Sequence, residues 1–199
     1  MIEWTTGVLA AGGLPGVFLL MVAENLFPPM PSEVIMPLAG FTAARGQMSI
    51  SGVIAAGVAG SVAGNAVWFE LARAFGAERM RRLVDRYGRW AGLGRAEVLK
   101  GEKALRRNGP AAVFLARMMP GIRTAISIPA GLVELPRMVF YFWTTLGTLL
   151  WTGGLALAGY ALEDKFYLVE EWAGVIGFGI LGLVLGGLGL HIWRARRAA

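Results

Sequence analysis

Long runs without a charged residue are the feature that most constrains this chain. Four such runs approach or exceed the length of a membrane-crossing helix: residues 5–23, 50–69, 138–162 and 172–193. A helix needs about 20 apolar residues to cross a hydrocarbon core of roughly 30 Å. The composition agrees, because 56% of the residues are apolar and only 16% are charged, whereas soluble domains carry about 25% charged residues. We therefore predict an all-α integral membrane protein in which the last run is an additional C-terminal transmembrane helix.

Prolines concentrate in apolar pieces that are too short to cross a membrane. Seven of the nine prolines lie within or beside such pieces: Pro28, Pro29, Pro31, Pro37, Pro120, Pro129 and Pro136. Proline breaks helices, and broken backbone at membrane depth is tolerated only where protein or a water-filled cavity covers it. The pattern favours two re-entrant hairpins, at residues 24–44 and 111–135, over the alternative of two loops lying at the membrane interface.

Charge is distributed as the topology of a membrane protein requires. Between Glu78 and Arg107 there are ten Lys or Arg and four acidic residues, and the C-terminal tail adds three arginines, whereas residues 163–171 hold four acids and one lysine. By the positive-inside rule, the segment 77–108 and the C-terminus face the cytoplasm. We expect this basic segment to lie as an amphipathic helix along the inner headgroup layer, which accounts for its charge without a nucleic-acid partner. The side of the N-terminus is left open.

A weak internal repeat links the two proline-rich regions. Glu24 follows a glycine by eight residues, and Arg117 does the same. The span after each hairpin carries the pattern G-x3-W-x7-G, as Gly64, Trp68 and Gly76 and then as Gly147, Trp151 and Gly159. With the orientation above, the two halves enter the membrane from opposite faces, which is the inverted-repeat plan of many transporters. We therefore expect one membrane domain, residues 1–199, with repeat units at about 5–76 and 109–162.

Charged residues inside the apolar regions carry the functional argument. The first hairpin holds Glu24 and Glu33, and the second holds Arg117 and Arg123. A charge at mid-bilayer is costly and by default marks a transport path, and arginine binds phosphate through two parallel hydrogen bonds. We expect the arginines to bind a phosphate and the acids to balance them or to exchange protons; the structural alternative is that these residues only hold the hairpins together. Asn65, within an apolar span, either bridges helices or faces the cavity.

The remaining polar residues are assigned local roles. Glu70 and Arg73 have the spacing of an i,i+3 helix pair, and Ser32 and Ser127 are expected to bond to nearby backbone. The chain has one histidine, His191, and no cysteine, which excludes disulfides and thiol catalysis. We expect no bound metal, no cofactor and no enzymatic activity.

Two runs resemble the signatures of a known family. The run Glu24-Asn-Leu-Phe-Pro-Pro-Met-Pro-Ser-Glu33, continuing to Pro37-Leu-Ala-Gly40, resembles the first signature of the DedA family (the VTT, or SNARE-associated Golgi protein, superfamily). The run Phe114-Leu-Ala-Arg117-Met-Met-Pro120-Gly121-Ile-Arg123, closing at Pro129-Ala-Gly131, is similar to the second. The similarity covers roughly residues 15–165. Met118 stands where the family usually has phenylalanine, and Asn65 stands where it commonly has an acid.

The resemblance implies an integral membrane lipid transporter with two inverted re-entrant hairpins. Bacterial members are implicated in returning undecaprenyl phosphate across the cytoplasmic membrane and eukaryotic relatives in phospholipid scrambling, and several bacterial members depend on the proton-motive force. The family's functional acids fall on Glu24 and Glu33 of this chain, and its functional arginines fall on Arg117 and Arg123. The leading hypothesis is therefore a flippase or scramblase of a bacterial inner membrane that moves a phosphate-bearing lipid, either undecaprenyl phosphate or a phospholipid. The alternatives are a proton-coupled transporter of an ion or small solute and a membrane lipid phosphatase; the lack of catalytic histidines and cysteines argues against the second.

Overall fold

The computed structural model describes residues 2–26, 32–87, 94–119 and 122–162, and every regular element in these ranges is a helix. The helices are α1 (Ile2–Leu26), α2 (Ser32–Ala44), α3 (Ile50–Tyr87), α4 (Arg95–Arg117), α5 (Ile122–Ala125), α6 (Ser127–Leu132) and α7 (Arg137–Ala161). The prediction of an all-α chain is confirmed. The acidic link 163–171 and the predicted C-terminal span 172–193 lie outside the described residues.

Helix α1 does not form the single straight span predicted over residues 5–23. Its backbone turns sharply at Gly13, where φ is 51° and ψ is −138°, a conformation that glycine adopts readily and other residues avoid. Pro15 follows in the first turn after the break, where its missing N–H removes no helical hydrogen bond. The apolar helix that continues, Gly12–Leu26, is about 22 Å long at 1.5 Å per residue, which is shorter than a bilayer core of roughly 30 Å.

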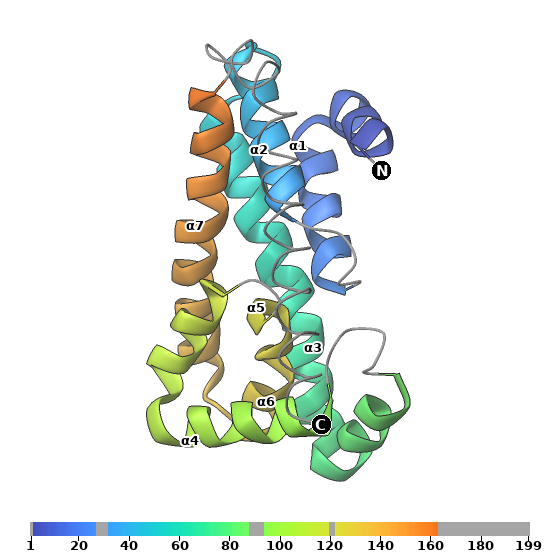
Figure 1. Ribbon diagram of the computed structural model, residues 1–199, viewed down its shortest axis with the longest axis vertical. Helices are drawn as coiled ribbons and strands as arrows, with labels where there is room; N and C mark the ends of the chain where they lie inside the picture. Colours follow the sequence, from blue (N-terminus) through green and yellow to red (C-terminus); the bar gives the residue numbers. More distant parts are fainter. Residues whose placement is uncertain (1, 27–31, 88–93, 120–121, 163–199) are drawn as a thin grey trace, which may run out of the picture. The chain divides into compact units, whose positions relative to one another are not determined.

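Helices α3 and α7 are the long elements to which the others attach. The helices predicted over residues 50–69 and 138–162 are present as parts of these two. Within the described residues, the segment Ile50–Arg86 is the one helix whose length and apolar composition suffice to cross a membrane. Helix α3 bends at Gly76, where φ is +71°, and α3 and α7 lie in contact with each other (Figure 1).

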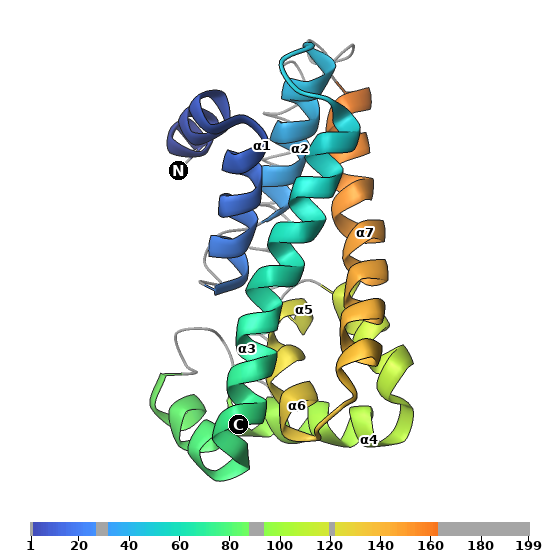
Figure 2. The same ribbon diagram turned by 180° about the vertical axis from the view of Figure 1, so that it is seen from behind.

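Two helical hairpins pack against the α3–α7 pair from opposite ends. The first consists of α2 and the part of α1 that follows the kink; the second consists of the last turns of α4 together with α5 and α6 (Figures 1 and 2). Their contacts are reciprocal, because α1 packs on α3 and α2 on α7, while α4 packs on α7 and α6 on α3. The re-entrant depth of these hairpins and the inverted repeat stay predictions.

Glycines allow the reciprocal contacts to be close. A Cβ added at Gly40 of α2 would overlap the backbone carbonyl of Ala156 in α7, and one added at Gly159 would overlap the backbone of Pro37. In the second hairpin, a Cβ at Gly131 of α6 would overlap the carbonyl of α3 residue Phe69. Small residues at such positions let helix backbones approach each other, as they do in packed membrane helices.

The basic segment begins and ends at bends in the chain. After Gly76 the last turns of α3 diverge from the helix axis, and α4 bends at Asn108, where φ is −148°. Pro110 causes the second bend because proline removes a helical hydrogen bond and clashes with the preceding turn. The side chain of Arg81 donates two hydrogen bonds, of 2.9 and 3.0 Å, to the carboxylate of Glu102 and so links the two parts.

Candidate functional site

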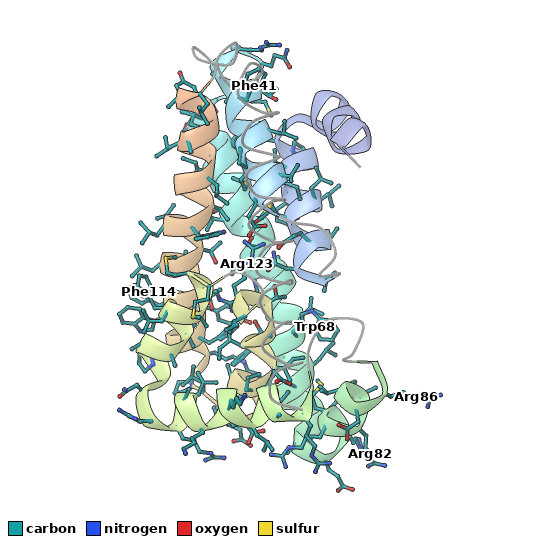
Figure 3. All side chains as sticks on the ribbon, viewed as in Figure 1. Phe41, Trp68, Arg82, Arg86, Phe114 and Arg123 are labelled. Atoms are coloured by element: carbon teal, nitrogen blue, oxygen red, sulfur yellow. The ribbon has the colours of Figure 1, made fainter. Side chains whose placement is uncertain are left out.

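A buried ion pair joins the two hairpins. Arg123, on the short helix α5, donates from Nη2 to Oε1 of Glu24, near the end of α1. Arg123 is 9% exposed and Glu24 is 3% exposed. Figure 3 shows Arg123 midway along the helices, far from Arg82 and Arg86 at the basic end. The structure therefore brings together two of the predicted site residues, which are 99 positions apart in the sequence.

Arg117, the last residue of α4, is 2% exposed and has only neutral hydrogen-bond acceptors. Its Nη atoms donate to Asn65 Oδ1 at 2.6 Å, Ser127 Oγ at 3.0 Å, Thr144 Oγ1 at 3.2 Å and the carbonyl oxygen of Arg123. The guanidinium carbon also lies 5.7 Å from the centre of the Phe140 ring. Among the described residues, no carboxylate forms an ion pair with Arg117.

Asn65 is the junction of this network. Its Nδ2 donates to Asn25 Oδ1 at 2.6 Å and to the Ser61 carbonyl at 2.8 Å, and its Oδ1 accepts from Arg117 at 2.6 Å and from Ser127 Oγ at 2.9 Å. A guanidinium can only donate, so the amide oxygen must face Arg117. The side chain thus bridges helices and also lines the cavity described below.

The neighbours of Asn65 extend the network to the carboxylate of Glu24. Asn25 Nδ2 lies 2.5 Å from Glu24 Oε2 and 3.2 Å from Ser61 Oγ, and the Asn25 carbonyl accepts from Trp68 Nε1 at 3.0 Å. Sequence reasoning missed Asn25 and Ser61. The available signals were that Asn25 adjoins Glu24 and that Ser61 precedes Asn65 by one helical turn.

Ser127 differs from its predicted role as a local backbone partner. It is fully buried, and its hydroxyl donates to Asn65 and accepts from Arg117. A serine in the second hairpin thereby forms part of the arginine site, because the hydroxyl can donate and accept at the same time.

Glu33 does not join the cluster. It lies exposed in the first turn of α2, where the helix dipole favours an acid, and it has no hydrogen bond or ion pair with another described residue. Glu33 therefore forms no ion pair with either arginine among the described residues, although its charge lies close enough to act on that of Glu24. The cluster instead holds one carboxylate, Glu24, and two guanidinium groups.

A small polar cavity lies beside the two arginines. Its volume is about 10 Å³, which is about the space that one water molecule needs. The lining residues are Asn25, Ser61, Asn65, Arg117, Arg123, Thr148, Trp151 and Thr152. Within the described part of the chain, no group of three or more His, Asp or Glu side chains is placed to hold a metal ion.

A second polar cluster lies at the exit of the second hairpin. Arg137 donates two hydrogen bonds, of 2.8 and 2.9 Å, to the carboxylate of Glu70, and Tyr141 donates to the same carboxylate at 3.1 Å. Arg73 donates to the carbonyl of Leu135 at 2.9 Å. The predicted pairing of Glu70 and Arg73 within one helix is present only as an attraction between their charges, because the hydrogen bonds of each side chain reach across to the segment that leads into α7.

A family model described as the VTT domain matches residues 29–161, which include α2 of the first hairpin, the whole second hairpin, and all of α3 and α7. The chain belongs to the VTT-domain family. The resemblance seen in the two signature runs is thus confirmed. No solved structure matches the chain significantly.

Relatives from bacteria carry two kinds of name. A protein of Lactococcus lactis subsp. cremoris named "Alkaline phosphatase-like protein" is 37% identical over 86% of this chain and 82% of its own length. "Undecaprenyl phosphate transporter A" of Staphylococcus aureus is 30% identical over 81% of this chain and 79% of its own length. The protein of the same name in Bacillus subtilis is 27% identical over 100% of this chain and 94% of its own length.

Proposed function

We propose that this VTT-domain protein is a membrane transporter that translocates a phosphate-bearing lipid, with Arg117 and Arg123 as the phosphate-binding residues. The observation that carries the proposal is Arg117, a fully buried guanidinium that is surrounded by neutral acceptors. Relatives named undecaprenyl phosphate transporter support a polyprenyl phosphate as the lipid. The location proposed with it is a bacterial cytoplasmic membrane.

The charge of the cluster favours an anionic substrate. Glu24 contributes one negative charge, and Arg117 and Arg123 contribute one positive charge each, so the described cluster has an excess of one positive charge. A buried charge without a counter-ion costs several kcal/mol. The phosphate of a lipid, which carries roughly −1 to −2 charges at neutral pH, would remove this cost, whereas a cationic or neutral head would not.

Glu24 offers a route to proton coupling. While the carboxylate of Glu24 is ionised, it is paired with Arg123. Once the carboxylate is protonated, the guanidinium of Arg123 is free to bind the phosphate. Uptake of a proton together with a lipid phosphate then keeps the charge of the cluster nearly constant. Glu33, exposed in the first turn of α2, is proposed to balance charge outside the cluster.

The names of the Lactococcus relatives make a lipid phosphatase the second candidate. Such an enzyme needs a nucleophile or an activated water beside a general base. Ser127, a buried hydroxyl that accepts from Arg117 at 3.0 Å, donates to the neutral amide of Asn65 instead of to a base. This arrangement supports binding and transfer of an intact phosphate over its hydrolysis.

The test is lipid translocation in liposomes that contain the purified protein. Polyprenyl phosphate and the uncharged polyprenol are compared as substrates for wild type, Arg117→Gln, and a control, Arg82→Gln, which removes an arginine that is exposed at the basic end. We expect Arg117→Gln to lose at least nine-tenths of the phosphate-lipid transfer and Arg82→Gln to retain it. Normal transfer by Arg117→Gln would refute the site, and release of inorganic phosphate would favour the phosphatase. Transfer of a small solute without lipid movement would favour a solute transporter.

A further inference from the structure

Two buried donors beside the arginine site have no acceptor. Nε of Arg117 and Nε1 of Trp151 are both buried and lack a hydrogen-bond partner among the described residues. Leaving such a donor unsatisfied is costly, so native structures do so rarely and usually where a water or ligand belongs. Both residues line the same cavity of about 10 Å³, which has room for about one oxygen atom or water molecule.

Comparison with Trp68 shows that the unpaired indole N–H is particular to Trp151. Trp68 and Trp151 occupy the same place in the two copies of the G-x3-W-x7-G pattern. Trp68 Nε1 donates to the carbonyl of Asn25 at 3.0 Å. Trp151 Nε1 has no such protein acceptor in the described part of the chain. The indole of the second copy is therefore available to a ligand.

Close packing of α7 on α4 brings Trp151 to the arginine. A Cβ added at Gly147, one turn before Trp151, would lie 2.7 Å from the Cβ of Arg117 and 3.3 Å from the carbonyl oxygen of Phe114. A larger residue at position 147 would move α7 away from α4. The glycine thus keeps the tryptophan and the guanidinium at one cavity.

The chemistry of the cavity selects an oxygen that only accepts hydrogen bonds. Asn65 has all four of its hydrogen-bonding positions occupied, and the Thr152 hydroxyl already donates to the carbonyl of Thr148 at 2.7 Å. Among the buried side-chain atoms of the lining residues, the two without a hydrogen-bond partner are both donors, Nε of Arg117 and Nε1 of Trp151. A phosphoryl oxygen accepts from both and its negative charge strengthens both bonds. A water or an alcohol oxygen accepts without that charge, and the ammonium of an amine cannot accept at all.

We infer that Trp151 is a substrate-binding residue whose indole N–H donates to one oxygen of the lipid phosphate, in a position that a water molecule fills when no lipid is bound. This inference rests on the proposed function of the arginine site. The indole N–H of Trp151 on α7 would then bind the phosphate together with the arginines of the second hairpin, so that the phosphate contacts both α7 and that hairpin. Loss of this donor should weaken recognition of the phosphate and leave recognition of the lipid tail unchanged.

The test is the variant Trp151→Phe, which keeps an aromatic ring and removes the N–H. Its control is Trp143→Phe on the same helix, where the indole packs edge-on against Phe114 with ring centres 6.0 Å apart. Binding of polyprenyl phosphate and of polyprenol is measured for the full chain in detergent. We expect Trp151→Phe to bind the phosphate lipid about tenfold more weakly or worse, as for a lost hydrogen bond to a charged group, and to bind polyprenol as wild type does.

A second measurement covers the case in which Trp151→Phe fails to fold. The indole ¹H–¹⁵N signal of Trp151 in the wild-type protein, assigned by single-site labelling, should move downfield with polyprenyl phosphate but not with polyprenol. An unmoved signal, or equal weakening for both lipids in Trp151→Phe, would overturn the inference. If Arg117→Gln abolishes phosphate-lipid binding while Trp151→Phe binds normally, the inference fails and the proposed function stands; if both bind normally, both fail.

Discussion

Replacing Glu24 by glutamine should destabilise the protein until an anion is supplied. The substitution leaves the shape of the side chain but raises the excess charge of the buried cluster from one to two positive charges, because Arg123 loses its counter-ion. Breaking a buried pair by removing one partner costs about 3–5 kcal/mol. For a chain of this size, each kcal/mol shifts the unfolding midpoint by about 2–4 °C, so a decrease of roughly 6–20 °C is expected.

The assay is thermal unfolding in detergent, with and without polyprenyl phosphate. Two variants complete the design: Glu33→Gln, which neutralises an exposed acid of the same hairpin, and the double variant Glu24→Gln with Arg123→Gln, which removes both charges of the pair. We expect the first to unfold like wild type and the double variant to be more stable than Glu24→Gln, because replacing both partners of a buried pair is often nearly neutral. The phosphate lipid should raise the midpoint of Glu24→Gln more than that of wild type.

Two results would refute this reasoning. If Glu24→Gln unfolds within about 2 °C of wild type, which corresponds to less than 1 kcal/mol, the ion pair does not hold the hairpins together. If the double variant is as unstable as Glu24→Gln alone, the loss comes from the carboxylate's other contacts, such as the one with Asn25, and not from an unpaired guanidinium.

Three further predictions concern packing, surface charge and the arginine fork. Gly159→Ala should destabilise the fold by several kcal/mol because the added methyl group meets the backbone of α2, whereas Gly154→Ala, where nothing lies within 4 Å, should unfold at the wild-type temperature; equal midpoints for the two variants would contradict the packing. Arg137→Gln should lower the free energy of unfolding by less than about 1 kcal/mol because its pair with Glu70 is largely exposed, and a larger loss in chemical unfolding would show that the cluster is structural. Arg117→Lys should lower phosphate-lipid transfer at least tenfold, since a lysine cannot reproduce a planar fork; transfer at the wild-type rate in liposomes would exclude a role for that geometry.

Features that depend on local composition were predictable from the sequence. The apolar runs identified α3 and α7, and the prolines identified the regions in which helices are interrupted, because both signals act within a few turns of the chain. The signature runs also identified the family. The kink at Gly13 was missed, since a glycine inside an apolar run is compatible with a straight helix as well as with a break.

Pairing between distant residues was only partly predictable. The types of charge at Glu24 and Arg123 indicated an interaction, but which acid pairs with which arginine depends on how the hairpins are placed, and Glu33 therefore has a different environment from the one expected. The same holds for Glu70, whose partner Arg137 lies 67 positions away. Ser127 was misassigned because a serine hydroxyl gives no sequence signal that distinguishes a backbone partner from a side-chain partner.

All four hydrogen-bonding positions of the Asn65 amide are occupied, which has a consequence for how the hairpins can move. The side chain holds α1 through Asn25 and the second hairpin through Arg117 and Ser127. Moving the second hairpin away from α3 breaks the bonds to Arg117 and Ser127 together, because both end on the same amide oxygen. Interfaces of this kind switch between discrete arrangements instead of deforming gradually. We therefore predict that the proposed passage of a headgroup between the hairpins is an all-or-none event, which requires the bonds from Arg117 and Ser127 to Asn65 to break.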